Sequence, residues 1–188
     1  MRSRVSFSVL FACLFGSAFA DAAEPIRYTV RFSAPQTHYV EVEAAVPTDG
    51  EPSIELMMPV WTPGSYMVRD YARHVEGVTA KTAQGMPLSV QKTRKNRWRV
   101  STDKTPHVLI TYRVYCREMG VQTNWVDGSF AMLNGAATFL TRADAPARPH
   151  DVALVLPAGW AKSYCGLRDG QGEHRYLADD YDALVDSP

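Results

Sequence analysis

Apolar and polar side chains alternate with a period of two in the dominant pattern of this chain. Ile26, Tyr28 and Val30 alternate with charged and polar neighbours, and Val108 and Ile110 begin a second run of the same kind. Successive side chains of a strand point to opposite faces of a sheet, so this alternation is typical of strands that bury one face. It predicts a sheet protein rather than a helical one.

Turns separate these runs at short intervals. Gln84-Gly85 and residues 94–96 have the composition of hairpin turns, and the 12 prolines of the chain interrupt longer elements. Only residues 66–73 and 181–185 fit a helical turn. Further strands are expected at residues 40–43, 97–101, 136–141 and 151–156. We therefore expect an all-β fold of one domain, an antiparallel β-sandwich or saddle-like sheet with one or two short helical turns.

Residues 1–20 have the pattern of a secretion signal. Arg2 and Arg4 precede an apolar stretch, and residues 18–20 fit the small side chains of a cleavage site. Further small residues up to Ala23 leave the cut between positions 20 and 23. The apolar stretch is shorter than the roughly 20 residues that a membrane-spanning helix needs. We expect a secreted or periplasmic protein without a membrane segment after cleavage.

Basic and acidic side chains balance each other, with 20 lysines and arginines against 20 aspartates and glutamates. A nucleic-acid-binding chain carries a marked basic excess, so no nucleic-acid partner is expected. Basic residues do surround Trp98, but charged and apolar side chains alternate there, as in a hairpin with one solvated face.

Cys116 and Cys165 remain once the signal, which carries Cys13, is removed. An even number of cysteines in an oxidising compartment permits a disulfide. Two separate buried thiols explain the sequence equally well, so both alternatives stay open. Neither cysteine has a Cys or His neighbour at metal-ligand spacing.

Two common hydrolase motifs are missing from the sequence. Many zinc peptidases use His-Glu-x-x-His, which places two imidazoles on one face of a helix, and none of the five histidines begins it. The Gly-x-Ser-x-Gly turn of a serine nucleophile is missing as well. We therefore expect no catalytic residue, no metal ligand and no cofactor in this chain.

Residues 61–75 hold the densest mixture of aromatic and charged side chains in the sequence. Tryptophan, tyrosine and arginine often anchor protein interfaces, while aromatic side chains also pack in cores. The interface candidates are Trp61, Tyr66, Arg69, Tyr71 and Arg73. We expect these side chains to pack within the domain or against a neighbouring one.

The run around these residues reads Pro59-Val-Trp-Thr-Pro-Gly-Ser-Tyr-Met-Val-Arg-Asp-Tyr-Ala-Arg-His-Val75. It resembles the N-terminal domain of the M61 (glycyl aminopeptidase) metallopeptidases. Other segments agree with this family in the same order, at residues 112–115, 122–127, 133–140 and 180–188. Together they cover most of the chain after the signal.

The resemblance implies a β-rich N-terminal domain at residues 24–178, and at residues 179–188 the start of a linker into a catalytic domain that this chain lacks. Intact members are zinc aminopeptidases with His-Glu-x-x-His in the catalytic domain, so zinc is expected there. The chain would then be the non-catalytic domain of a secreted M61-like zinc aminopeptidase. It would pack on the catalytic domain of the same polypeptide and help to shape the cleft for the N-terminus of a peptide substrate. Asn134 is the candidate substrate-binding residue, by analogy of position alone; a turn-forming Asn-Gly is the alternative.

A function of another class fits the same residues. A self-contained, secreted β-sandwich module could bind a glycan or a peptide through exposed tryptophan and tyrosine side chains. An exposed aromatic strip and retention of a specific ligand would favour this alternative.

Overall fold

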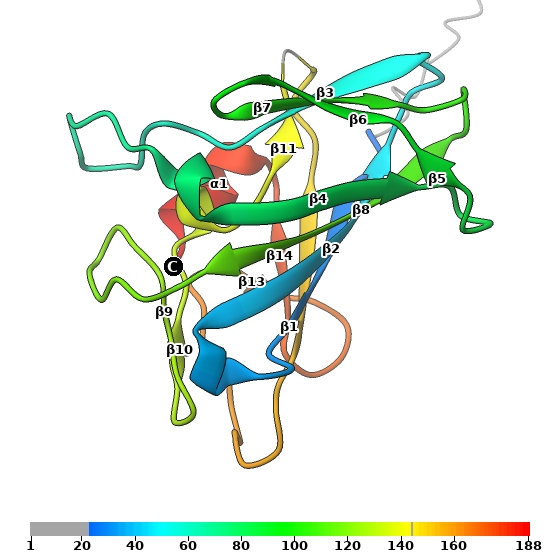
Figure 1. The fold of residues 1–188 in the computed structure, drawn as a ribbon. Coiled ribbons are helices and arrows are strands. Elements are labelled where there is room, and N and C mark those ends of the chain that lie inside the picture. The colour runs from blue at the N-terminus through cyan, green and yellow to red at the C-terminus, as the bar shows by residue number, and fades with distance from the viewer. Residues whose placement is uncertain (1–22, 144) are drawn as a thin grey trace, which may run out of the picture.

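The computed structural model describes residues 23–143 and 145–188. The signal peptide predicted for residues 1–20 lies outside the described residues. The described chain consists mostly of strands, with one short α-helix and three 3₁₀ helices, which confirms the expected all-β fold class (Figure 1). No helix within it is long and apolar enough to cross a membrane.

The larger sheet has eight strands in the order β13-β14-β12-β1-β2-β8-β4-β5. In chain order they are β1 Ile26–Arg31, β2 Tyr39–Pro47, β4 Val75–Lys81, β5 Pro87–Leu88, β8 His107–Tyr115, β12 His150–Val155, β13 Arg168–Asp169 and β14 Arg175–Ala178. Neighbouring strands are antiparallel except β1 and β12, which run parallel. The parallel pair brings the C-terminal third of the chain beside the first strand.

The smaller sheet has four strands in the order β11-β3-β7-β6 and lies across the upper end of the larger sheet in Figure 1. Its strands are β3 Ser53–Met57, β6 Val90–Arg94, β7 Arg97–Ser101 and β11 Thr141–Arg142. In β7, Trp98 and Val100 are buried while Arg97 and Arg99 are not, which confirms the alternation expected around Trp98.

The buried faces of the two sheets share one hydrophobic core. Ile54 and Trp98 of the smaller sheet belong to the same cluster as Val42 and Ile110 of the larger one. Complete burial of an aliphatic or aromatic side chain contributes about 1.5–3 kcal/mol, so these alternating rows are the main source of stability.

The short helices lie at the ends of strands. They are η1 Pro35–Thr37, η2 Tyr71–His74, η3 Gly135–Ala137 and α1 Tyr181–Asp186. The helical turns expected within residues 66–73 and 181–185 correspond to η2 and α1. The strand expected at residues 136–141 is wrong, because η3 occupies its first part and only Thr141 is in a strand. Two short strands, β9 Trp125–Val126 and β10 Ala131–Met132, form a separate hairpin at the lower left of Figure 1.

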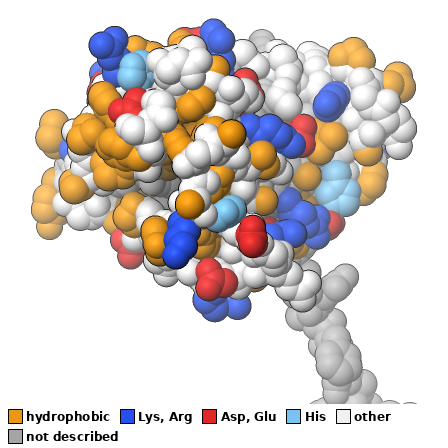
Figure 2. Space-filling model, turned by 90° about the horizontal axis from the view of Figure 1, so that it is seen from below, with side chains coloured by type: hydrophobic (Ala, Val, Ile, Leu, Met, Phe, Trp, Pro, Cys, Tyr) orange, Lys and Arg blue, Asp and Glu red, His pale blue; other side chains and the backbone are white. Residues whose placement is uncertain are grey.

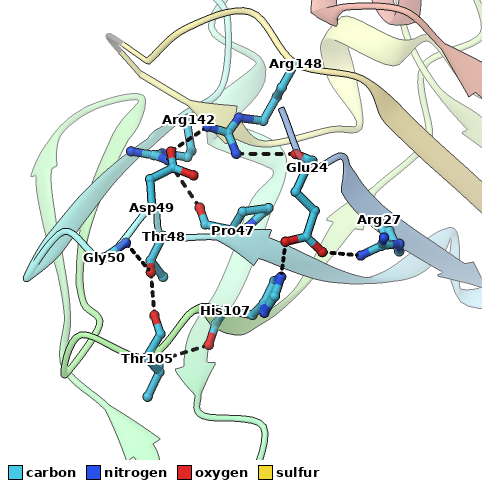
Figure 3. A network of polar contacts seen from close by, with 10 residues as sticks. All are labelled: Glu24, Arg27, Pro47, Thr48, Asp49, Gly50, Thr105, His107, Arg142 and Arg148. Atoms are coloured by element: carbon cyan, nitrogen blue, oxygen red, sulfur yellow. Dashed lines mark hydrogen bonds and ion pairs between the residues drawn. The ribbon is translucent and has the colours of Figure 1, made fainter. Parts of the chain in front are cut away.

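An ionic network holds the segment after β2, as Figure 3 shows. Asp49 accepts hydrogen bonds from Arg142 and from Arg148, the latter at 2.6 Å. Both guanidinium groups are almost fully buried, and Arg148 also donates to the Glu24 carbonyl at 3.4 Å. The guanidinium groups of Arg148 and Arg142 hold the pKa of the Asp49 carboxyl below its usual range. This network fastens the start of the domain to β11 and to the segment that leads into β12.

Candidate interface

The segment between β3 and η2 forms a closed loop, and we call the residues from Val60 to Arg69 the signature loop. The Arg69 amide donates to the Val60 carbonyl at 2.8 Å and closes the loop at its base. Further along, the Ser65 amide donates to the Thr62 carbonyl at 3.2 Å, across a turn in which Gly64 has a φ of 72°. Glycine adopts this left-handed conformation without steric cost, which explains the Pro-Gly pair of the motif.

Apolar side chains at the tip of the signature loop are exposed. Tyr66 is fully exposed, Val68 is 83% exposed, and Met67 and Trp61 are also in contact with solvent. Adjacent exposed apolar side chains mark surfaces that bind another molecule or domain. The tip is therefore a candidate contact surface.

Arg69 at the end of the signature loop and Arg73 of η2 both contact residues 117–123. The Arg69 Nη2 donates to Gln122 and, at 3.3 Å, to the Ser65 hydroxyl. The Arg73 Nη2 donates to Glu118 at 2.7 Å. A surface ion pair such as the second contributes only about 0–1 kcal/mol, so these contacts position the two loops more than they stabilise the fold.

The five interface candidates lie together but differ in exposure. Trp61, Tyr66 and Arg73 are exposed and Arg69 is half-buried, whereas Tyr71 is only 5% exposed. Tyr71 therefore packs in the core. An interface role for the other four stays a prediction.

A small cavity of about 220 Å³ lies beside the base of the loop, with Arg69 and Tyr71 in its lining. The Arg69 Nε and the Tyr71 hydroxyl are buried and have no hydrogen-bond partner among the described side chains and backbone groups. Burial raises the pKa of the Tyr71 hydroxyl. An unpaired buried donor costs about 1–3 kcal/mol, so an acceptor that entered the cavity would stabilise the Arg69 guanidinium.

Asn134, the predicted substrate contact, is buried at the N-cap of η3. Its Oδ1 accepts from the Ala136 amide at 3.0 Å, and its Nδ2 donates to the Val121 carbonyl at 3.3 Å. Asn124 in turn accepts from the Asn134 amide at 2.7 Å. The sequence predicted no role for Asn124, because its partners lie ten or more positions away along the chain. The two asparagines join residues 117–123 to η3.

Both cysteines are free in the structure, so the disulfide that the sequence left open is not formed. The Cys116 thiol is buried and donates to the Val114 carbonyl at 3.3 Å. Burial raises its pKa to about 12, which makes it a poor nucleophile. Cys165 is partly buried and its thiol contacts the Ser187 carbonyl at 3.6 Å.

A larger concave surface, which we call the apolar groove, lies near the C-terminal end of the described chain. It has a volume of about 650 Å³, and its lining includes Leu133, Leu154, Leu156, Trp160 and Pro188. Figure 2 shows hydrophobic side chains gathered on the left of the face seen from below, the side on which β9 and β10 lie in Figure 1. The sequence did not predict the groove, because its lining comes from segments that lie far apart along the chain.

The described residues, 23–143 and 145–188, contain no side chains grouped as metal ligands. Within these ranges no group of three or more histidine, cysteine, aspartate or glutamate side chains is placed to hold a metal ion. His74, next to the signature loop, accepts a hydrogen bond from the Arg73 Nε at 2.9 Å. Its pKa is lowered by burial and then by Arg73.

Comparisons with known proteins identify the family of this chain. The family model of the Peptidase M61 N-terminal domain matches residues 27–188. A crystal structure of an aminopeptidase N family protein from Idiomarina loihiensis is similar over 86% of this chain, with 27% sequence identity and a TM-score of 0.79. The chain spans only 28% of the length of that protein. A comparison with curated proteins finds no match. Because the family model covers almost the whole described chain, the chain belongs to the M61 peptidase family, as its N-terminal domain.

Proposed function

We propose that this chain is the non-catalytic N-terminal domain of a secreted or periplasmic M61 zinc aminopeptidase. In this proposal it packs on the catalytic domain of the same polypeptide and helps to shape the cleft that admits the N-terminus of a peptide. The family match over residues 27–188 carries the proposal. The similar protein supports it, because the shared domain is only 28% of that chain and leaves room for further domains.

Zinc and the catalytic glutamate would belong to the following domain. Two histidines of this chain have structural contacts: His150 lies in the core, and His38 contacts the Val126 carbonyl at 2.6 Å. Export and zinc binding stay predictions, as does the contact from Asn134 to the substrate. Because the Asn134 side chain is engaged by η3 and Val121, a substrate contact would compete with those hydrogen bonds.

The test compares residues 24–188 with the intact protein. We expect the short chain to bind no stoichiometric zinc and to release no product from aminoacyl p-nitroanilides. The intact protein should contain zinc and cleave substrates with a free N-terminus, and a chelator should abolish this activity. Zinc-dependent aminopeptidase activity in residues 24–188 would overturn the proposal.

The alternative of a binding module draws support from Tyr66 and Tyr164, two aromatic side chains that are strongly exposed. They lie on different loops, and Tyr66 belongs to the signature loop of the family. Specific retention of residues 24–188 on a glycan or peptide matrix, lost in Tyr66→Ala, would favour the module. We expect no such retention.

A further inference from the structure

The apolar groove runs between two exposed segments. Residues 129–133, which include β10, form one side and residues 159–167 the other, with Leu154 and Tyr176 of the larger sheet also in the lining. Trp160 is held in place because its ring lies 5.1 Å from that of Phe32, centroid to centroid. Stable β-structure and a packed tryptophan thus define the shape of the groove.

The groove has little polar chemistry with which to recognise a small charged ligand. Among the described residues that line the groove, Lys162 alone has an ammonium, carboxylate or guanidinium side chain. Phe130 is 45% and Met132 36% exposed, so the apolar rim faces solvent. An apolar groove with so few charges fits apolar side chains of a polypeptide better than a phosphate, a sugar or a metal complex.

The end of α1 directs the chain into this groove. Leu184 and Val185 are buried, which fixes the helix, and Ser187 and Pro188, which follow its last residue, are part of the groove lining. The Cys165 thiol contacts the Ser187 carbonyl on the groove wall. Any polypeptide continuing from Pro188 therefore starts within the groove.

We propose that the segment that follows Pro188 in the intact peptidase lies in the apolar groove, with apolar side chains between Met132 and Trp160. This inference rests on the proposed function, in which a catalytic domain follows in the same polypeptide. The similar aminopeptidase-family structure is matched over only 28% of its length, so a domain of this kind occurs there within a longer polypeptide. The seated segment would fix the direction in which the catalytic domain leaves the β domain.

Amide hydrogen exchange tests the proposal on the intact peptidase and on the chain that ends at Pro188. We expect residues 128–133 and 157–165 to exchange at least about tenfold more slowly in the intact peptidase, because the seated segment covers them. The turn at residues 84–86 should exchange equally in both proteins. Equal exchange of the groove segments in the two proteins would overturn the proposal.

A matched pair of methionine substitutions sharpens the test. Met132 lines the groove, whereas Met86 is an exposed methionine in the turn between β4 and β5. In the intact peptidase, Met132→Glu should restore fast exchange of the groove segments and Met86→Glu should not. Both side chains are exposed in the shorter chain, so both variants should keep its thermal midpoint.

The remaining outcomes separate this inference from the proposed function. An intact protein that contains zinc and has aminopeptidase activity but an unprotected groove overturns the inference alone. An intact protein without zinc and without activity overturns the proposed function and, with it, the inference. A dimer of the intact peptidase that Met132→Glu dissociates would assign the groove to a second copy and also overturn the proposal.

Discussion

His150 lies in the core between the rings of Tyr28 and Tyr181, at centroid distances of 5.8 and 5.5 Å. The Tyr28 hydroxyl donates its proton to the Leu140 carbonyl at 2.9 Å. The Nδ1 of His150, 3.1 Å from the same hydroxyl, must therefore donate to the tyrosine oxygen. The imidazole is neutral, and its pKa is lowered to about 4 by burial and then by Arg148, with Asp180 opposing.

Acid should destabilise the domain through this histidine. Because its folded pKa of about 4 lies below the ordinary value of 6.5, the unfolded chain binds a proton more readily between these pH values. The contribution is complete above pH 6.5 and is lost as the pH falls towards 4, by about 3 kcal/mol in total. Urea unfolding across this range should show a shallower pH dependence for His150→Gln than for the unchanged chain. Identical slopes would contradict the assignment.

At the scale of elements, η3 and α1 lie so close together at Gly135 that no side chain would fit between them. A Cβ on Gly135 would lie 2.5 Å from the Leu184 carbonyl oxygen and 3.0 Å from the Val185 Cα. Both neighbours are backbone atoms, which cannot move aside without shifting α1. Glycine is thus required here by contact and not by backbone conformation.

Gly135→Ala should lower the stability of the domain by about 1–3 kcal/mol, the usual cost of overpacking a buried site. Gly128→Ala is the matched control, because Gly128 is exposed and a Cβ there meets nothing within 4 Å. The control should change the free energy of unfolding by only a few tenths of a kcal/mol. Urea denaturation measures both variants, and equal stabilities would show that α1 yields without cost.

The sequence predicted the elements that neighbouring residues determine. The alternation of apolar and polar residues predicted β1 and β8, and turns with Gly and Asn predicted the hairpins. The strand predicted at residues 136–141 failed because distant groups satisfy that backbone: the Tyr112 hydroxyl accepts from the Leu140 amide at 3.1 Å, and Asn124 donates to the Ala137 carbonyl at 3.1 Å. The composition of the signature loop left two alternatives open, packing within the domain or against a neighbouring one. The apolar groove was not predicted, since its lining comes from segments that lie far apart along the chain.

Across the whole molecule, the ionic network around Asp49 and the exposed apolar side chains lie at opposite ends of the larger sheet. In the antiparallel pair of β2 and β8, Tyr39 pairs with Tyr115 and Pro47 with His107. The ionic network around Asp49 follows the Pro47 end, whereas residues 117–123, which hold the signature loop, follow the Tyr115 end. Exposed apolar side chains gather near the latter, on the signature loop, on residues 119–121 and on the β9–β10 hairpin. The exposed apolar side chains therefore lie at the end of the sheet that the ionic network does not occupy, where another domain has room to bind.

This division predicts that Asp49→Asn weakens the fold. The change removes the negative charge between Arg142 and Arg148, whose side chains are only 4% and 5% exposed, and should cost about 1–3 kcal/mol. Asp103→Asn is the matched control, because Asp103 shares the left-handed backbone, with a φ of 49° against 54° for Asp49, but has no buried arginine partner among the residues that the structure describes. Asparagine tolerates this conformation, so backbone strain is the same in both variants. Urea unfolding should show a loss of stability for Asp49→Asn alone, and equal losses would mean that the buried arginines need no carboxylate at this position.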